Sequence, residues 1–176
     1  MNLSLDPAVR QQQLTTIKNY VEANHSVNGS GVYDQSTADA MNAKASPGVF
    51  VFVTSVSVDE VRNSLDWSEV LDTVSGLTGL QQFGFNTLFS NGDYDPSLVA
   101  SRDALVRIFP SHMSSTRAAV LADATRLATI AENLLAADGT GPGGGNGSAA
   151  AQSKVMGEGA EGNITVAILQ EAEASG

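Results

Sequence analysis

The sequence predicts a mainly α fold: a compact helical domain with a small two-stranded β element and a glycine-rich loop. Apolar residues recur at helical spacing behind recognisable helix caps such as Asp6-Pro7. One short run, Val49 to Val53, has the β-branched and aromatic composition of a strand. Six glycines fall within the eleven residues 138–148. We therefore expect a single domain over residues 1–176, with a flexible loop at 138–148 and termini that are free to move.

The first expected helix begins at Asp6-Pro7, because Asp is a good N-cap and Pro suits the first helical position. Its apolar face continues to about residue 23. Residues 24–31 are polar and contain glycine, and they predict a loop. Asp34 is expected to cap a short helix to about residue 42, and the strand 49–53 follows after Ser46-Pro47-Gly48.

Two helix starts follow the strand. Ser57 with Glu60 forms a capping-box pattern, and Asp66 with Glu69 repeats it. Gly76 and Gly79 weaken the helical pattern, so a break is expected before Leu80. A further apolar face then extends from Leu80 through Phe83, Leu88 and Phe89 to a turn at Asn91-Gly92.

The C-terminal half predicts three more helices. Asp95-Pro96 repeats the first helix start and predicts a helix over 96–109, burying Leu98 and Leu105. Ser114 or Ser115 is expected to open the longest helix, which reaches about Ala137. Residues 153–157 are expected to form a short strand beside 49–53. Thr165 is expected to cap a last helix over 166–174.

Composition excludes several classes of function. The net charge is −10 with only nine Lys and Arg, so direct nucleic-acid binding is not expected, because phosphate neutralisation needs clustered cations. There is no cysteine, which excludes a disulfide framework and thiol chemistry. The N-terminus lacks the pattern of a signal peptide, and no apolar stretch has the length of a membrane span.

No motif in the chain predicts catalytic, cofactor-binding or metal-binding residues. The glycine-rich loop contains no lysine and follows an expected helix, which is unlike a phosphate-binding loop. Residues 91–95 place oxygen ligands at alternate positions but lack the glycine and terminal glutamate of a calcium loop. His25 and His112 have no obvious partner. We expect no cofactor.

A protein that acts by packing against other subunits needs interface residues and no catalytic site. The strand is short and apolar and must be covered on both faces. Trp67 is more typical of a core or interface residue than of a ligand platform, and the scattered arginines are expected to pair with acids of this chain or of a neighbour. The interface candidates are Val49, Phe50, Phe52, Trp67, Phe85, Arg117 and Arg126.

Several segments resemble a known family in their order along the chain. They are Val58-Asp59-Glu60-Val61, Asp66-Trp67-Ser68-Glu69-Val70, Thr116-Arg117-Ala118-Ala119, the run over 126–136, Gly139-Thr140-Gly141 and Glu161-Gly162-Asn163-Ile164-Thr165. This order is similar to a family of small proteins encoded among the structural genes of tailed bacteriophages, and it covers about residues 5–170. The chain departs from the family in Phe52 and in its longer glycine-rich loop. The resemblance implies a virion protein, assembled in the host cytoplasm.

The sequence and the resemblance together lead to one main hypothesis and two alternatives. The main hypothesis is a non-enzymatic structural subunit at the tail or head–tail junction, partnered by other virion subunits and forming a homo-oligomer on the particle. No membrane partner is expected. One alternative is a capsid cement or decoration protein. The other is a glycoside hydrolase acting on cell walls, with Glu69 and Asp72 as its paired carboxylates.

Overall fold

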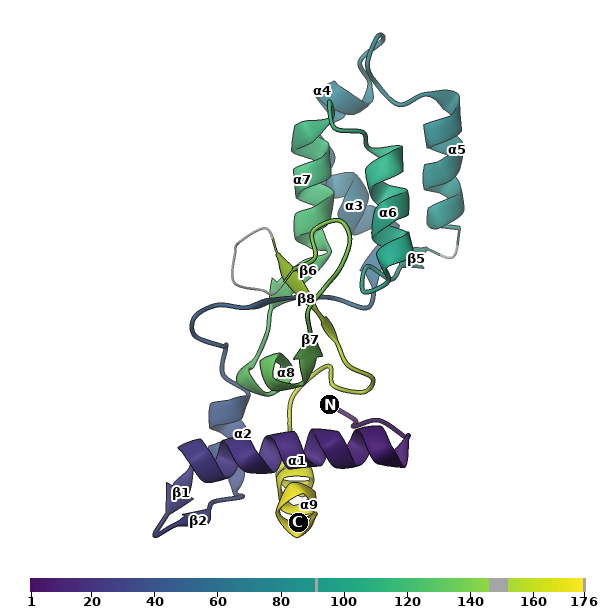
Figure 1. The fold of residues 1–176 in the computed structure, drawn as a ribbon. Helices are drawn as coiled ribbons and strands as arrows, with labels where there is room; N and C mark the ends of the chain where they lie inside the picture. Colours follow the sequence, from purple (N-terminus) through teal and green to yellow (C-terminus); the bar gives the residue numbers. More distant parts are fainter. Residues whose placement is uncertain (91, 146–151, 176) are drawn as a thin grey trace. The chain divides into compact units, whose positions relative to one another are not determined.

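The computed structural model describes residues 1–90, 92–145 and 152–175 (Figure 1). The chain divides into two compact units. Unit 1 comprises Met1–Val51, Leu127–Ala137 and Lys154–Gly176, and unit 2 comprises Phe52–Arg126 and Asp138–Ser153. The expectation of a single domain stays a prediction, because compact grouping alone does not show that either unit folds independently.

Helices make up 48% of the chain and strands 14%, so the fold is mixed α/β. The prediction of a mainly α fold is correct in that helix predominates and wrong about the extent of β structure. Instead of one two-stranded element, the described residues contain a four-stranded sheet and two small two-stranded sheets. Most of these strands have only two or three residues, and patterns that short carry little periodicity.

Unit 1 is built around its N-terminal helix. Helix α1 (Pro7–Asn24) contacts α8 (Ile130–Leu135) and α9 (Val166–Ala174), and α2 (Gln35–Met41) contacts the same two helices. Asp6 caps α1, Asp34 caps α2 and Thr165 caps α9, as the sequence predicts. The core of the unit comes from these helices and from the N-terminal segment: Leu3, Leu14, Ile17, Val21, Ala38, Met41, Ala131, Ile164, Ile168, Leu169 and Ala172.

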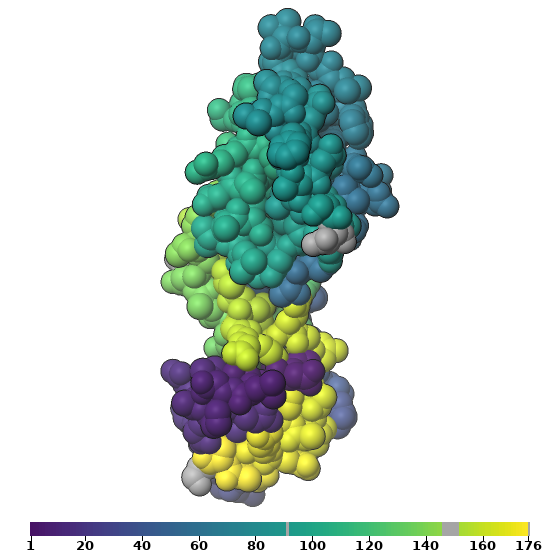
Figure 2. Space-filling view, turned by 90° about the vertical axis from the view of Figure 1, so that its right-hand side faces the viewer, coloured from purple at the N-terminus to yellow at the C-terminus, as the bar shows by residue number. Residues whose placement is uncertain are grey.

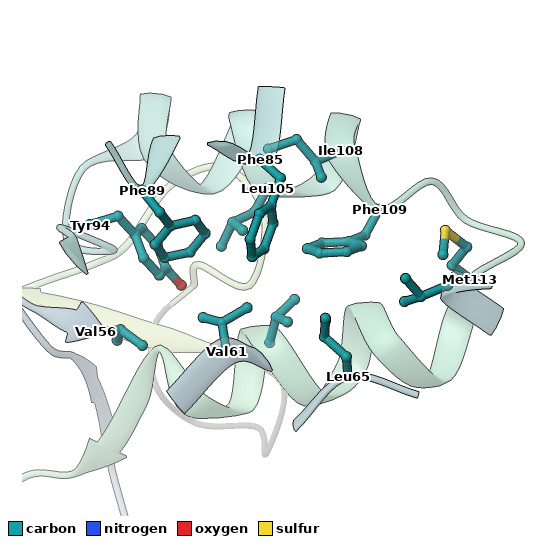
Figure 3. Packing of buried hydrophobic residues seen from close by; sticks show 12 residues of the cluster. Val56, Val61, Leu65, Phe85, Phe89, Tyr94, Leu105, Ile108, Phe109 and Met113 are labelled. Atoms are coloured by element: carbon teal, nitrogen blue, oxygen red, sulfur yellow. The ribbon is translucent and has the colours of Figure 1, made fainter. Parts of the chain in front are cut away.

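Unit 2 contains five helices in its described residues: α3 (Val58–Ser64), α4 (Trp67–Val70), α5 (Gly79–Leu88), α6 (Val99–Ile108) and α7 (Ser114–Asp123). Strand β4 (Val56–Ser57) pairs antiparallel with β5 (Asp93–Tyr94). Helix α5 contacts α6, and α7 contacts both α3 and α6. The aromatic and aliphatic core between these helices is drawn in Figure 3.

The four-stranded sheet has the order β6-β3-β8-β7. Its strands are β3 (Phe50–Phe52), β6 (Thr125–Leu127), β7 (Ala136–Ala137) and β8 (Ser153–Met156), and the chain passes from one unit to the other within β3, β6 and β8. Strands β7 and β8 are antiparallel, with Ala136 opposite Met156. The expected strands 49–53 and 153–157 are confirmed, including their position beside each other.

The segment 24–31 was expected to be a loop, and this is wrong. It forms a hairpin in which β1 (Ser26–Val27) pairs antiparallel with β2 (Ser30–Gly31). The two residues between the strands, Asn28 and Gly29, have φ values of 51° and 84°. Positive φ at both central positions defines the tight hairpin turn for which Asn-Gly is the preferred sequence.

The expected long helix from Ser114 to about Ala137 is also wrong. It is divided into α7, β6 and α8. Thr129 begins α8 with a complete capping box, in which its hydroxyl accepts from the Glu132 amide and the Glu132 carboxylate accepts from the Thr129 amide. Between the two helices, Thr125–Leu127 joins the sheet next to β3. Sheet pairing and a second cap therefore override the helical periodicity of the segment.

Helix α6 begins later than predicted, at Val99. The Asp95 carboxylate accepts hydrogen bonds from the Ser97 amide at 2.8 Å and the Ser97 hydroxyl at 2.6 Å, which forms a turn ahead of the helix. Leu98 is consequently at the N-cap position and 55% exposed, although it was expected to be buried. Leu105 is fully buried, as expected.

Candidate protein-binding surface

The end of unit 2 that contains α4 is positioned by a carboxylate. Asp66 caps α4 by accepting from the Ser68 amide at 3.0 Å. The sequence predicted a capping box between Asp66 and Glu69, and this is wrong, because Glu69 reaches a different helix. Its two carboxylate oxygens accept from the amides of Ser115 and Thr116, at 3.0 Å and 2.9 Å, in the first turn of α7. Since Met113, the N-cap residue of α7, provides no side-chain cap, Glu69 satisfies that helix end and joins α4 to α7.

The chain then turns sharply after α4. Asp72 accepts from the amides of Val74 and Ser75 at 2.8 Å and 2.6 Å. A Cβ at Gly76 would lie 2.3 Å from the Asp72 carbonyl oxygen, so the close approach of the chain requires glycine there. In Figure 1 this segment projects beyond the ends of the neighbouring helices of unit 2, and Figure 2 shows it standing clear at the top of the view. Val74 is 95% exposed as a result.

Helix α5 returns from this turn with one apolar face inward and another outward. Thr78 and Gln81 form its capping box. Phe85 and Phe89 face the core, with ring centroids 4.8 Å apart, and the Phe85 ring meets that of Phe109 edge-on at 6.0 Å (Figure 3). With 3.6 residues per turn, the side opposite Phe85 faces away from this core.

Five large apolar side chains are exposed on α4, on the turn that follows it and on α5. They account for half of the ten exposed large apolar residues among the described residues. We call this set the apolar surface: Trp67 (50% exposed), Leu71 (70%), Val74 (95%), Leu80 (81%) and Phe83 (68%). Single exposed apolar residues are ordinary, whereas a group of this kind is typical of a binding site.

A pocket of about 290 Å³ lies beside Trp67 and Leu71, two members of the apolar surface. We call it the apolar pocket. Its lining is mostly apolar and comes from α3, α4, the turn and α5: Arg62, Leu65, Trp67, Val70, Leu71, Leu77, Gln82, Phe85 and Asn86. A second hollow, of about 300 Å³, lies beside α5 and α6 and includes Leu80, Gly84 and Ile108.

Charge is absent from the segment that follows Asp72, whereas Asp66, Glu69 and Asp72 are close in sequence to Trp67 and Leu71. From Thr73 to Gly92 the sequence contains no Asp, Glu, Lys, Arg or His, in a chain of net charge −10. Arg62 is the charged residue that lines the apolar pocket, and its guanidinium lies 3.6 Å from the Asp59 carboxylate. A partner that covers Val74, Leu80 and Phe83 therefore meets no charged residue of their own segment.

The structure brings together two of the seven predicted interface residues. Trp67 and Phe85 both line the apolar pocket, although Phe85 is otherwise buried in the core. Four others are half-buried and lie elsewhere: Val49, Phe50, Arg117 and Arg126. Arg117 is on α7 and Arg126 is on β6. The expectation that one long helix carries both residues is therefore wrong.

Phe52, the remaining interface candidate, has no exposed surface and is a core residue of unit 2. The sequence reasoning missed Leu71, Val74, Leu80 and Phe83, because their helical spacing predicts a buried face. The charge-free run over 73–92 was a signal in the sequence that could have indicated this surface.

The other exceptional feature of unit 2 is the buried guanidinium of Arg102. Its Nη1 donates to the carbonyl oxygens of Pro96 and Ser97 at 2.5 Å and 3.0 Å, its Nε donates to that of Pro142 at 2.9 Å, and its Nη2 donates to that of Thr140. Burial lowers the pKa of this guanidinium. These bonds attach residues 140–142 to the start of α6.

The glycine-rich loop is therefore held in place over its described part. Besides Arg102, the Gly139 amide donates to the Gly145 carbonyl oxygen at 3.0 Å. Gly141 and Gly143 have φ values of 76° and 71°, which glycine adopts without strain. The predicted flexibility of the loop also concerns residues 146–148, which lie outside the described residues.

The carboxylates proposed for glycoside hydrolysis have other roles. The pKa of Glu69 is lowered chiefly by the backbone amide of Thr116, and that of Asp72 chiefly by the amide of Ser75. A general acid for glycoside hydrolysis needs a raised pKa. Both carboxylates are used as hydrogen-bond acceptors that fix the backbone, and no observation favours the hydrolase alternative.

Residues 93–95 and the two histidines make local contacts. Asp93 accepts from the Ser55 hydroxyl at 2.6 Å, and Asp95 accepts from Ser97. His112 Nε2 lies 2.8 Å from the Ser75 carbonyl oxygen, and the rings of His25 and Tyr20 have centroids 5.8 Å apart. In the part of the chain that the structure describes, no group of three His, Cys, Asp or Glu residues could hold a metal ion.

Comparison with known proteins gives no relative: no family model, no curated protein and no solved structure matches the chain. Across the described ranges, no helix combines the length and the apolar character needed to cross a membrane. The apolar surface and the residues that build it are therefore the features of the molecule that bear on its function.

Proposed function

We propose that the protein is a non-enzymatic structural subunit of a tailed-phage virion that binds other subunits through the apolar surface of unit 2. The observation that carries this proposal is the exposure of five large apolar side chains on α4, α5 and the turn between them, two of which line a pocket. Removing apolar area from water is favourable by about 25 cal/mol per Å². Packing against another protein is the direct way to cover such a surface.

The contacts of the carboxylates in this region support a role in subunit packing more than a role in catalysis. The carboxylates nearest to Trp67 hold helix ends and a turn, as the contacts of Asp66, Glu69 and Asp72 show. Such contacts fix the backbone beneath the apolar surface, and a preformed surface loses less entropy on binding. The proposed mechanism is therefore stoichiometric burial of a rigid apolar face.

The resemblance to tailed-phage structural proteins supplies the setting of the proposal. In that setting, we place the protein at the tail or head–tail junction, in a homo-oligomer with other virion subunits as neighbours. Rings arise when one surface of a subunit binds a different surface of the next. A negatively charged lumen, as expected from the net charge of −10, would repel DNA and let it pass.

The proposal is tested on phage particles from host cells in which the phage that encodes the protein is replicating. Particles are purified on a density gradient, separated into heads and tails, and probed with an antibody against the protein. We expect it in the tail or junction fraction at a fixed number of copies per particle. A location on heads alone would favour the cement alternative, and absence from all particles would overturn the proposal.

A further inference from the structure

We infer that the apolar pocket of unit 2 binds one large apolar side chain of a partner polypeptide, and that a carboxylate next to this side chain pairs with Arg62. The inference rests on the proposed function in one respect, namely that this part of unit 2 binds protein. It goes further by naming the pocket as the place of contact and by stating the chemistry of the segment that enters it. The lining of the pocket, its volume and its one charged residue carry it.

The base of the apolar pocket belongs to the core of unit 2. Leu65, Val70 and Phe85 are core residues with only 8–9% of their surface exposed, and all three line the pocket. Figure 3 shows Leu65 and Phe85 on opposite sides of this core. Side chains that are fixed by core packing do not have to reorganise when a ligand enters. The base of the pocket is therefore preformed.

The wall of the pocket continues onto the surface of the protein. Trp67 and Leu71 line the pocket, and at least half of each side chain is exposed. A ligand that fills the pocket and covers these two side chains removes more apolar area from water than one that only fills the pocket. A polypeptide can do both, with one side chain in the pocket and its neighbouring residues across Trp67 and Leu71.

The volume of the pocket suits one side chain. At about 290 Å³ it lies just below the range of about 300–1,000 Å³ that is typical for drug-sized ligands. A cavity of about 150 Å³ holds benzene, so a phenylalanine or leucine side chain fits. Side chains of this kind, seated in a pocket at the centre of an interface, contribute most of the binding free energy in protein complexes. The volume therefore favours a partner side chain.

The charge of the lining indicates what should stand next to that side chain. Among the described residues that line the pocket, Arg62 is charged, and Gln82 and Asn86 supply amides. The Arg62 guanidinium lies 3.6 Å from the Asp59 carboxylate, and more than half of each side chain is exposed. Such an exposed ion pair stabilises the protein little, so the guanidinium remains available to a second carboxylate. Arginine binds carboxylates through two parallel hydrogen bonds.

The acidic residues close in sequence to Trp67 are already engaged by backbone amides. Asp66, Glu69 and Asp72 each accept at least one such hydrogen bond, within α4, from α7 and within the turn. Among the described residues, none of these three lines the pocket. A group that enters the pocket therefore meets the positive charge of Arg62, which favours a carboxylate beside the apolar anchor.

The test uses the fluorescence of Trp67, which is the single tryptophan of the chain and lines the pocket. The purified full chain is titrated with blocked hexapeptides that differ only at two central positions, which are Phe-Glu, Phe-Gln or Ala-Glu. We expect saturable binding of the Phe-Glu peptide with a shift of the emission to shorter wavelength. Each of the other two should bind at least about fivefold more weakly, since it lacks the carboxylate or the anchor. Equal affinities, or no binding, would overturn the inference.

Arg62→Gln tests the charged contact. It should raise the Kd of the Phe-Glu peptide to that of the Phe-Gln peptide and leave the latter unchanged, which is the signature of a pairwise interaction in a double-mutant cycle. Arg107→Gln is the matched control, because Arg107 is an exposed arginine on α6 that does not line the apolar pocket. It should keep the preference for Phe-Glu. A preference that survives Arg62→Gln contradicts the proposed pair.

Leu71→Ser tests the apolar contact. It should weaken binding of the Phe-Glu peptide by more than about fivefold, because it removes part of the pocket wall. Leu98→Ser is the matched control, because Leu98 is also exposed and lies outside the pocket. Far-UV circular dichroism confirms that both variants remain folded. Equal affinities of the two variants would place the peptide elsewhere and overturn the inference.

A free acid tests whether the ligand is a polypeptide. Phenylpropionate carries the ring and a carboxylate without a peptide backbone. We expect it to bind at least about fivefold more weakly than the Phe-Glu peptide, because it fills the pocket without covering Trp67 and Leu71. Equal or tighter binding of the free acid would identify a small-molecule site and overturn the inference.

The outcomes separate this inference from the proposed function. Failure of the peptides to bind overturns the inference, while the protein can still be found in the tail or junction fraction of particles. Selective binding of the Phe-Glu peptide supports the inference even if particles lack the protein, in which case only the virion assignment fails.

Discussion

The guanidinium carbon of Arg102 lies 3.8 Å from the centroid of the Phe52 ring. Both side chains are among the largest that are fully buried. The aromatic face and the carbonyl oxygens of residues 96, 97, 140 and 142 together replace the water around a buried cation. This arrangement joins β3, the start of α6 and the glycine-rich loop within unit 2.

Arg102→Met is expected to lower the free energy of unfolding by about 2–4 kcal/mol, because it leaves buried carbonyl oxygens without donors. The free energy of unfolding of Arg102→Lys should lie between those of the wild type and Arg102→Met, since an ammonium keeps the charge but not the planar set of donors. Urea denaturation measures both. Arg107→Met on the exposed side of the same helix is the control. Equal stability of Arg102→Met and Arg107→Met would contradict the role of this clamp.

Glu69→Gln is expected to lower the thermal unfolding midpoint near neutral pH and to lose this effect in acid. The amides of Thr116 and Ser115 hold the pKa of Glu69 below its ordinary value. The stabilisation from the charged carboxylate is therefore complete above the unfolded-state pKa and is lost as the pH falls through the lower folded-state pKa.

The measurement is the midpoint of wild type and Glu69→Gln between about pH 7 and about pH 3. The gap between the two proteins should close as the pH falls. Glu158→Gln, a change at an exposed glutamate, controls for the loss of one negative charge. A gap of constant size across this range would show that the carboxylate does not act as the cap of α7.

Glu132→Ala is expected to lower the free energy of unfolding by about 2–4 kcal/mol, because it removes a buried acceptor shared by two segments. Glu132 is 1% exposed. Its carboxylate accepts from the Thr129 amide at 2.9 Å and from the Gly162 amide at 2.7 Å. Glu60→Ala removes the same capping position from α3, where the contact is exposed. It should lower the free energy of unfolding by less than Glu132→Ala does. Chemical denaturation of both variants measures the two losses, and a larger loss for Glu60→Ala would refute the prediction.

Gly159→Ala is expected to lower the free energy of unfolding of the protein by more than about 2 kcal/mol. Gly159 has a φ of 69°, and a Cβ there would lie 1.7 Å from the Asn2 carbonyl oxygen. Gly79→Ala is the opposite case, because α5 begins at Gly79 and a Cβ would meet nothing within 4 Å. It should be neutral or stabilise by up to about 1 kcal/mol. Comparison of the two midpoints in urea checks both statements.

Local rules predicted the helix starts where one residue determines the outcome. Asp6, Asp34, Ser57 and Thr165 each cap the expected helix, because the cap is a contact between residues two or three positions apart. Glu69 was assigned to its own helix by the same rule and instead reaches α7. A carboxylate with two possible amide partners is placed by the tertiary structure, which spacing alone does not reveal.

The candidate site shows the same division. Trp67 was predicted as an interface residue and is half exposed beside the apolar pocket. Leu80 and Phe83 have the spacing of a buried helix face, yet they point away from the core because Phe85 and Phe89 occupy it. A helix with two apolar faces can bury either one, and only the position of α6 and α7 determines which.

The sequence by itself determined the predominance of helix, the positions of the main caps, the presence of strands within 49–53 and 153–157, and the absence of cysteine. These follow from contacts between near neighbours and from residue type. Tertiary structure decided the division of 114–137 into two helices and a strand, the burial of Phe52 against Arg102, and the exposure of the apolar surface. Each of these depends on which distant segment pairs with or covers the residue, and that free energy belongs to the packed fold.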